Sequence, residues 1–480
     1  MCVNKRFSSD KSKKNAAKMR EEEEKKLHIA MYPWFAMGHL TSFLHISNKL
    51  AERGHRISFY IPTKTQSKLV SFNLHPHLIS FVPIHVPHVD GLPPGAETTA
   101  DVPYHLISFL MTAMDLTRPQ LEASLQNLKP QIIFFDFTHW LPEAARRFGI
   151  KSLHYCTVSP ATHGYLISPD RRLDEFPLTE ADLMQPLPGF PSSCIKLRAH
   201  EARRLAKATV MEFGNGITFT KRQKIGLDDS DAIVFKTSRE MEGVYADYVA
   251  EKWGKAVILA GPVVPERPKS VLEGETAAFL SRFEKGSVVY CAFGSECVLV
   301  KEQFQQLVLG LELTGRPFLV ALKPPAGSET VESALPDGFK KRVGSRGLVH
   351  GGWVQQQLIL SHGSVGCFVT HCGCGSLLEG MVNECQLVLV PNVGDQFINA
   401  RIMSDDLKVG VEVEKGDEDG FFTKEGVCRA VEAVMVKESH VGKEVRANHK
   451  KWRDFLLSKG LEDSYIDDFI KKLHALITAT

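Results

Sequence analysis

The chain lacks any long apolar run. No uninterrupted hydrophobic stretch in its 480 residues approaches the roughly 18 to 20 residues of a membrane span. The first 33 residues are rich in charge and have no apolar core of the kind that a secretory signal requires. We therefore expect a protein without an integral membrane segment.

An excess of charge of one sign is also absent. Lys and Arg together number 58 and Asp and Glu 56, so the formal net charge is only +2. A balance this even does not favour a nucleic acid or an anionic membrane as partner. The ligand must be recognised by local groups.

The spacing of the cysteines does not indicate a disulfide framework. Ten cysteines are spread over the chain with no compact, even spacing, which indicates reduced thiols and a cytoplasmic protein. Cys372 and Cys374 stand beside His371, but the paired Cys-x2-Cys or His spacings of zinc sites are missing nearby. We expect no metal site.

Two common enzyme motifs are missing. GHLTSF follows the first predicted strand where a Rossmann dehydrogenase would have Gly-x-Gly-x-x-Gly, and no Gly-x-Ser-x-Gly element supports a serine hydrolase. Hydrophobic residues make up 43% of the chain, an ordinary globular share, and the length suffices for two or three domains.

Strands and helices are predicted to alternate twice along the chain. LHIAMYP, HRISFYIP, QIIFFDF and KSLHYC read as strands of a first series, and SVVYCAFGS begins a second one after the proline-rich passage PERPKSVLEG. Such alternation is typical of α/β folds with doubly wound parallel sheets, whose ligands lie at the carboxyl ends of the strands. A longer helical region is expected over 103–128.

The stretch 353–396 carries the strongest local signal. Gly366 to Thr370 reads as a strand, HCGCGS follows at 371–376, and an apolar helix pattern begins at Leu377. Gly373 and Gly375 would let an anion reach the unpaired N–H groups of a helix N-terminus, where phosphate binds well. The residues alone leave open that these glycines merely turn the chain and that Trp353 is a core aromatic.

Two residues in the first half are candidates for proton transfer. His39 follows the first strand and Asp136 ends QIIFFDF, both at the edge of the sheet where ligands bind. Taken singly, His39 could be an incidental surface group, and Asp136 a helix cap or a structural hydrogen-bond acceptor. A buried acid needs a partner in either case.

Taken together, the motifs have a family pattern. Trp353, the Gln355-Gln356 pair, His371-Cys372-Gly373, Ser376, Glu379 and Asp395-Gln396 resemble the donor-binding signature of plant family 1 UDP-glycosyltransferases. The likeness covers nearly all of the chain after residue 26. It implies a GT-B fold, in which two Rossmann-like doubly wound domains face each other across a cleft.

The resemblance also implies a division of the chain. Residues 1–26 form a disordered or solvated charged tail, 27–263 an N-terminal acceptor-binding domain, 264–274 a linker, and 275–455 a C-terminal domain that binds the UDP-sugar. Residues 456–480 would be a helix that crosses back to the N-terminal domain. Acceptor loops are expected over 165–225, and the basic stretch 198–207 is expected to be solvated surface.

Roles for single residues follow from the same resemblance. The uracil would stack on Trp353 with Gln356 at its edge, and the ribose would bind Glu379. His371, Ser376 and the turn backbone at Gly373 and Gly375 would hold the diphosphate, with Ser295 facing it from the other side. Asp395, Gln396 and Thr157 would contact the transferred sugar, and Asp395 and Gln396 are expected to close the second strand.

The implied chemistry is an inverting single displacement. His39 would take the proton of the acceptor hydroxyl, and Asp136 would orient the imidazole and stabilise its charged form. Neither a metal nor a cofactor is expected, because the UDP-sugar is the donor substrate and the helix N-terminus can stabilise the leaving diphosphate. We expect a monomer.

One departure from the family pattern bears on the substrate. Many members have Trp-Asn where this chain has Cys374-Gly375, and a similar replacement is familiar in enzymes that extend the sugar of a flavonoid or anthocyanin 3-O-glycoside. The resemblance therefore implies a glycoside acceptor. A glycosyltransferase acting on a bare flavonoid or terpenoid aglycone is the alternative. A nucleotide-sugar-binding protein without catalysis is another, against which His39 and Asp136 argue.

Overall fold

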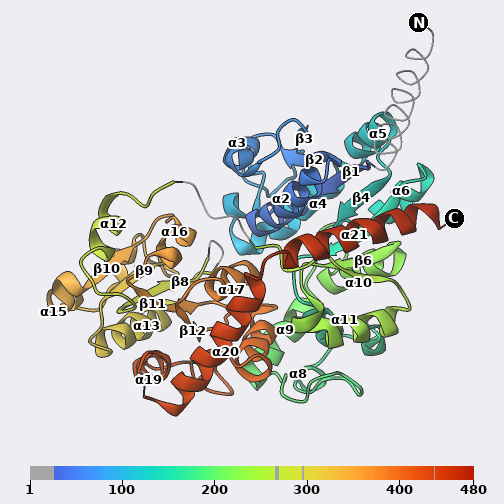
Figure 1. Ribbon diagram of the computed structural model, residues 1–480. Coiled ribbons are helices and arrows are strands. Elements are labelled where there is room, and N and C mark those ends of the chain that lie inside the picture. The colour runs from blue at the N-terminus through green and yellow to red at the C-terminus, as the bar shows by residue number, and fades with distance from the viewer. Residues whose placement is uncertain (1–25, 174, 265–269, 295–296, 437, 480) are drawn as a thin grey trace, which may run out of the picture.

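The protein consists of two lobes, each built around a parallel β-sheet (Figure 1). The computed structural model describes residues 26–173, 175–264, 270–294, 297–436 and 438–479. The predicted charged tail, apart from Lys26, and residues 265–269 of the predicted linker lie outside the described residues, as does Ser295. No helix in the described ranges is both long and apolar enough to cross a membrane.

The first sheet has seven strands in the order β3-β2-β1-β4-β5-β6-β7, all parallel. Its strands are β1 (His28–Tyr32), β2 (Arg56–Pro62), β3 (Ile79–Ile84), β4 (Ile132–Phe135), β5 (Lys151–Cys156), β6 (Ala232–Phe235) and β7 (Val257–Leu259). The helices of this half are α2 (Met37–Glu52), α3 (Gln66–Leu69), α4 (Ile107–Asp115), α5 (Arg118–Leu128), α6 (Leu141–Arg147), α7 (Pro160–Leu166), α8 (Glu180–Leu183), α9 (Ala199–Thr209), α10 (Phe219–Asp229) and α11 (Arg239–Trp253).

The second sheet has six parallel strands in the order β10-β9-β8-β11-β12-β13. Its strands are β8 (Val288–Ala292), β9 (Phe318–Ala321), β10 (Gly347–His350), β11 (Val365–Thr370), β12 (Gln386–Leu389) and β13 (Gly410–Glu412). The helices here are α12 (Gly274–Leu280), α13 (Lys301–Leu313), α14 (Val331–Ala334), α15 (Phe339–Val343), α16 (Gln356–Ser361), α17 (Cys374–Met381), α18 (Gln396–Arg401), α19 (Lys424–Met435) and α20 (His440–Leu456).

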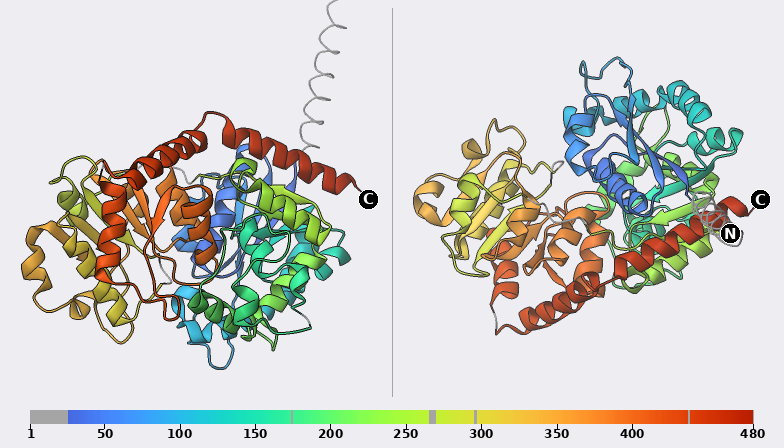
Figure 2. Two further views of the ribbon diagram at one scale, coloured as in Figure 1. Left: turned by 90° about the horizontal axis from the view of Figure 1, so that it is seen from below. Right: turned by 45° about the horizontal axis from the view of Figure 1, so that its top comes forward.

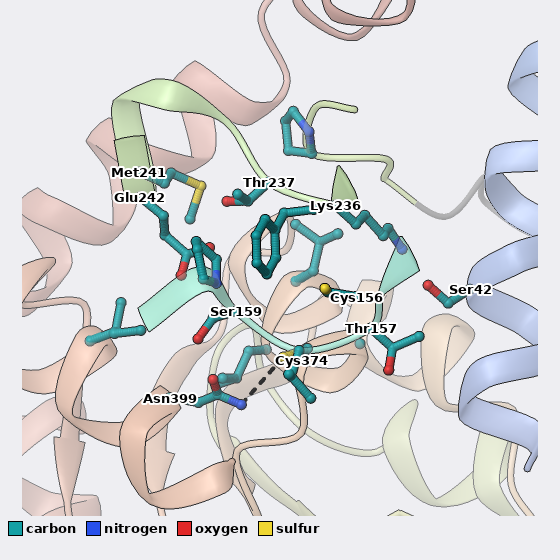
Figure 3. Close-up of a pocket in the computed structure, with 18 of the residues that line it drawn as sticks. Ser42, Cys156, Thr157, Ser159, Lys236, Thr237, Met241, Glu242, Cys374 and Asn399 are labelled. Atoms are coloured by element: carbon teal, nitrogen blue, oxygen red, sulfur yellow. Dashed lines mark hydrogen bonds between the residues drawn. The ribbon is translucent and has the colours of Figure 1, made fainter. Parts of the chain in front are cut away.

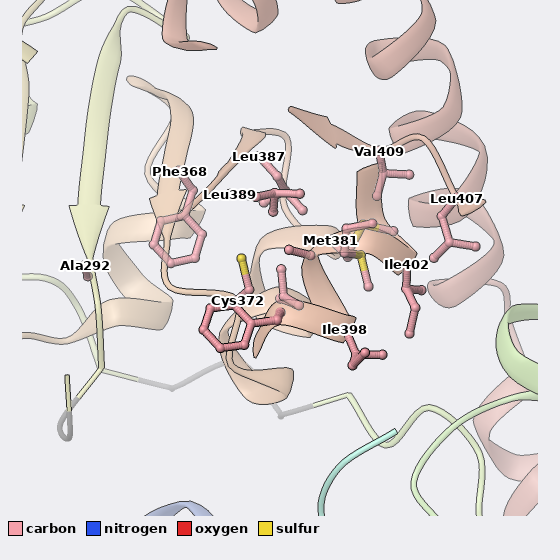
Figure 4. Close-up of a cluster of buried hydrophobic side chains, with 14 of the residues drawn as sticks. Ala292, Phe368, Cys372, Met381, Leu387, Leu389, Ile398, Ile402, Leu407 and Val409 are labelled. Carbon is pink, nitrogen blue, oxygen red and sulfur yellow. The ribbon is translucent and has the colours of Figure 1, made fainter. Parts of the chain in front are cut away.

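Both sheets are buried on both faces, which explains why their strands read as continuous apolar runs. In β1, Ile29 and Met31 belong to one hydrophobic cluster, whereas Ala30 and Tyr32 belong to the cluster on the opposite face. The second sheet is likewise packed between two clusters, and Figure 4 shows part of one of them around Phe368 and Met381. The predicted alternation of strands and helices, and the GT-B fold class, are confirmed.

The chain returns from the second lobe to the first. Helix α21 (Leu461–Thr478) packs against α2 and β7, and Ile466, Phe469 and Leu473 are fully buried in the first lobe's core (Figures 1 and 2). Gly261 allows this close approach. Its φ is +85°, and a Cβ there would lie 2.5 Å from the Cβ of Tyr465.

The helical region expected over 103–128 is present with one break, whereas one other local expectation was wrong. The helical region over 103–128 is divided into α4 and α5, because Pro119 has no backbone N–H to donate and is tolerated in the first turn of a new helix. Asp395 and Gln396 do not close the second strand, since β12 ends at Leu389 and these residues begin α18.

The basic stretch 198–207 is not simply solvated surface. Arg198 Nη1 lies 2.7 Å from Glu412 on β13, and Arg401 Nη2 lies 2.8 Å from Glu201 on α9. Arg401 also pairs with Glu412. Because α9 belongs to the first half of the chain and α18 and β13 to the second, these largely buried ion pairs tie the two lobes together.

Candidate active site

The order of strands reverses once in each sheet, and the candidate residues gather at those two points. In the first sheet β1 and β4 are adjacent, and the segments after them carry His39 and Asp136. In the second sheet β8 and β11 are adjacent and are followed by Gly294 and His371. Crevices outside the carboxyl ends of strands at such switch points are where open α/β sheets bind ligands.

His39 and Asp136 form a hydrogen-bonded pair. His39 lies in the first turn of α2, and its Nδ1 is 2.7 Å from Asp136 Oδ2. Asp136 is 3% exposed, and its carboxylate also accepts hydrogen bonds from the backbone N–H groups of Trp34 and Phe137, at 2.8 and 2.7 Å. This arrangement fixes the carboxylate and leaves Nε2 of the imidazole to accept a proton. Thr157 Oγ1 lies 3.4 Å from His39 Nδ1.

Helix α17 begins directly at the predicted glycine turn. Gly373 is its N-cap and no side chain caps it, so the N–H groups of the first turn are available to an anion. Cys372 takes a left-handed conformation with φ of 69°, which is strained for a residue other than glycine. Asn399 Nδ2 donates to the Cys372 carbonyl at 3.0 Å and stabilises the turn.

The imidazole of His371 lies between two glycines. A Cβ added to Gly294 would come within 3.0 Å of the ring, and one added to Gly373 within 2.7 Å of Nε2. The buried Nδ1 has no hydrogen-bond partner within the described structure. Burial lowers the pKa of His371 to about 4, so the ring is neutral at pH 7 and can donate a hydrogen bond to a phosphate without being charged.

Gln356 and Glu379 belong to one polar network. Gln356 Nε2 lies 2.7 Å from Glu379 Oε2 and 3.1 Å from Ser376 Oγ, and Gln357 Nε2 donates to the other oxygen of Glu379 at 3.2 Å. Burial raises the pKa of Glu379, and the two glutamine hydrogen bonds oppose that shift. Trp353, in the loop before α16, is 82% exposed and presents an open ring face.

Asp395 is held against the turn 371–376 that precedes α17, whereas the side chain of Gln396 binds backbone groups of the loop before α18. Asn399 Nδ2 lies 2.8 Å from Asp395 Oδ2, and the Cys374 thiol lies 3.6 Å from the same oxygen. The Gln396 side-chain carbonyl accepts from the backbone N–H groups of Asn392 and Val393, at 2.9 and 3.0 Å. Only the amide nitrogen of Gln396 is then suited to a sugar hydroxyl.

A cavity of about 240 Å³ is lined by residues of both lobes (Figure 3), and His39, Asp136 and His371 are not among them. Its lining includes Gly38 and Thr157 from the first lobe and Cys374 and Gly375 from the second. Asn399, which the sequence reasoning missed, also lines it and joins Cys374 in Figure 3. The available signal was its position one helical turn after Asp395, on the same face of α18. Within the described ranges, no cluster of three or more His, Cys, Asp or Glu side chains could hold a metal ion.

Two doubly wound parallel sheets whose carboxyl-end edges border one cavity define the GT-B fold. The crystal structure of Glycyrrhiza uralensis UGT73P12 in complex with glycyrrhetinic acid 3-O-monoglucuronide has this fold, with a TM-score of 0.77 over 94% of this chain and 96% of that one, at 22% identity. A Phytolacca americana UGT2 complex superposes with a TM-score of 0.73 at 24% identity, covering 93% of this chain and 99% of that one.

The chain belongs to the family described as UDP-glucoronosyl and UDP-glucosyl transferase, whose model matches residues 267–446. It is 62% identical over 450 residues to cyanidin 3-O-galactoside 2''-O-xylosyltransferase FGGT1 of Actinidia chinensis var. chinensis, covering 94% of this chain and 98% of that protein. It is 57% identical to anthocyanidin 3-O-glucoside 2''-O-glucosyltransferase of Ipomoea nil, with the same coverage. The protein is therefore a UDP-sugar-dependent glycosyltransferase.

Proposed function

We propose that this enzyme transfers a sugar, with inversion, from a UDP-sugar to a hydroxyl on the sugar of a flavonoid or anthocyanin 3-O-glycoside. The observation that carries the proposal is the 2.7 Å hydrogen bond between His39 and Asp136 beside the cavity that α17 also borders. A general base with an orienting carboxylate is what an alcohol nucleophile requires near neutral pH. A protein that only bound the nucleotide sugar would not need this pair.

The proposed reaction is a single displacement. The acceptor oxygen attacks the anomeric carbon while its proton moves to His39 Nε2, and the bond from that carbon to the phosphate oxygen breaks. Asp136 stabilises the imidazolium, and the electron pair leaves with the UDP. The N–H groups at the start of α17 and the His371 ring stabilise the negative charge that develops on the diphosphate.

For the donor, the arrangement supports the roles proposed from the family pattern. Trp353 offers its exposed ring to the uracil, and Glu379, fixed by two glutamines, faces the ribose. Asp395 is placed for the sugar hydroxyls by Asn399. No metal or cofactor enters the proposed mechanism.

For the acceptor, the support comes from aromatic residues around the base. The Phe137 ring centroid lies 5.1 Å from that of His39, and Phe213 and Phe219 lie 5.6 and 5.4 Å from Phe137. These partly buried rings suit a flat aromatic group. The names of the two relatives specify 3-O-glycosides of cyanidin and of anthocyanidins as acceptors.

An initial-rate panel tests this function. UDP-glucose, UDP-xylose, UDP-galactose and UDP-rhamnose are each combined with a flavonol, its 3-O-glucoside and an anthocyanin 3-O-glycoside, and products are identified by mass. We expect addition to the glycosides only. Addition to the bare flavonol at an equal or higher rate would replace the acceptor assignment by the aglycone alternative, and the absence of any product would refute the proposed function.

The proposal includes a monomer in the cytoplasm. The nine cysteines that the structure describes are all free thiols, which fits a reducing compartment. Size-exclusion chromatography with light scattering measures the oligomeric state, and a stable dimer at micromolar concentration would contradict the proposal of a monomer.

A further inference from the structure

The cavity beside the reaction centre continues to two charged residues that the mechanism does not use. Its lining includes Lys236, just after β6, and Glu242, in α11, which Figure 3 shows on opposite sides of the lining side chains. Cys374 and Thr157 border the same cavity. Both charged residues therefore face a cavity that is also bordered by Gly38, the chain neighbour of His39, and by Cys374 and Gly375 at the start of α17.

Lys236 has no partner among the residues that the structure describes. Its ammonium group makes no hydrogen bond or ion pair with them, and its attraction to Glu379 and Glu462 acts only over longer range. Burial lowers the pKa of Lys236 to about 8, because the charged form is poorly solvated there. An ammonium group in this position requires an acceptor from a ligand or from water.

Glu242, in contrast, has a carboxyl oxygen that lacks a hydrogen-bond donor among the described residues. It is 9% exposed, the Thr237 hydroxyl binds its carboxylate, and Oε1 is buried with no hydrogen-bond partner in the described structure. Its backbone breaks the helical conformation of α11, with φ of −137° and ψ of 17°. Burial raises the pKa of Glu242 to about 7. Its carboxyl oxygen calls for a donor.

A ligand that binds both residues must offer an acceptor to Lys236 and a donor to Glu242. A phosphate would bind Lys236 but be repelled by the Glu242 carboxylate. A metal ion would bind Glu242 but be repelled by the Lys236 ammonium group. An aromatic ring can attract the Lys236 ammonium group but offers Glu242 no hydrogen-bond donor. A hydroxyl both donates and accepts, so a ring bearing several hydroxyls satisfies both. The volume of about 240 Å³ is below the roughly 300–1,000 Å³ of drug-sized sites and suits a single sugar ring.

We propose that Lys236 and Glu242 form a subsite for a sugar ring of the reactants, Lys236 donating to its hydroxyls and Glu242 accepting from them. The inference rests on the proposed function, which brings two sugars to this place. One is the sugar being transferred and the other is the sugar already on the acceptor. Both carry the same chemistry, and binding measurements distinguish them.

The test uses Lys236→Met and Glu242→Gln, each of which keeps the size of the side chain. Calorimetric dissociation constants are measured for UDP against UDP-glucose and UDP-xylose, and for a flavonol against its 3-O-glucoside. We expect each variant to weaken one sugar-bearing ligand about 10-fold, the loss typical of a hydrogen bond to a charged group, while its sugar-free counterpart binds as before. Lys221→Met, an exposed lysine on α10 outside the cavity, is the matched control.

Each outcome is decisive. Selective loss for the UDP-sugars assigns the subsite to the transferred sugar, and selective loss for the 3-O-glucoside assigns it to the acceptor sugar. Constants within twofold of wild type for all sugar-bearing ligands, in both variants, would overturn the subsite. Equal weakening of UDP and UDP-sugars would also overturn it, since the effect would then lie outside the sugar. These constants do not depend on turnover, so a wild-type enzyme without product would refute the proposed function separately.

Discussion

At the residue scale, the proposed catalytic pair of His39 and Asp136 depends on how the Asp136 carboxylate is held. Two backbone N–H groups, of Trp34 and Phe137, and the His39 ring bind one carboxylate that is 3% exposed. All three groups donate, so the site is built for an acceptor with a full negative charge. An amide in its place would turn an NH2 group towards at least one donor.

We therefore expect Asp136→Asn to lower kcat by about 10²- to 10⁴-fold, because the imidazole loses its orientation and its stabilised charge. His39→Ala should lower kcat at least as much. Both variants should bind UDP with the wild-type dissociation constant, since the proposed nucleotide-binding residues are on the other lobe. Steady-state kinetics with calorimetry measure this, and near-normal turnover of His39→Ala would remove His39 from the mechanism.

At the element scale, α9 is tied to the second lobe by buried charges. Glu201 on α9 is fully buried and accepts two hydrogen bonds from Arg401, at 2.8 and 2.9 Å. Arg198 and Glu412 complete the cluster. Such a cluster holds the lobes in one relation, because separating them would leave uncompensated charges in a poorly solvated place.

Arg401→Met should destabilise the protein by about 3–5 kcal/mol, because the carboxylates of Glu201 and Glu412 stay buried with one cation fewer. Adding Glu201→Gln should recover part of that loss, which a double-mutant cycle in urea measures. Arg239→Met is the control. It breaks an ion pair with Asp247 whose partners are 60% and 63% exposed, and should change stability by less than about 1 kcal/mol. Strictly additive effects of the first two substitutions would contradict the cluster.

At the scale of the whole molecule, seven buried or partly buried histidines have lowered pKa values. Burial lowers their pKa values to about 3 or 4, so all are neutral in the folded protein at pH 7. They are His28, His45, His55, His154, His163, His371 and His449. In the unfolded chain each would be protonated below about pH 6.5. The contribution of these histidines to the free energy of unfolding is therefore fully present above pH 6.5 and is lost as the pH falls towards 4.

We expect the melting temperature at pH 5.5 to lie roughly 10 °C or more below that at pH 7.5. Each histidine then favours unfolding by up to about 1.4 kcal/mol, and in domains of this size 1 kcal/mol corresponds to roughly 2–4 °C. Glu242, Glu379 and Asp395, whose pKa values burial raises, act in the opposite direction but are fewer. Thermal melts at constant ionic strength test this, and an unchanged melting temperature would contradict it.

The sequence by itself determined what depends on neighbours along the chain. Apolar runs buried on both faces indicated the parallel sheets, and glycines 373 and 375 marked the helix N-terminus that α17 supplies. The pairing of His39 with Asp136, 97 residues apart, came from the family resemblance, and the structure places the two at 2.7 Å. Ser295 lies outside the described residues, and the other donor contacts and the domain boundaries stay predictions.

Only the tertiary structure decided which distant groups meet. Arg198 and Glu412 are 214 residues apart, and their ion pair depends on how the two lobes pack. Asn399 on α18 stabilises the strained turn at Cys372, and Lys236 and Glu242 share a cavity with Cys374 from the other lobe. Sequence periodicity reports whether a side chain is buried, but the identity of its partner is set by packing over long distances along the chain.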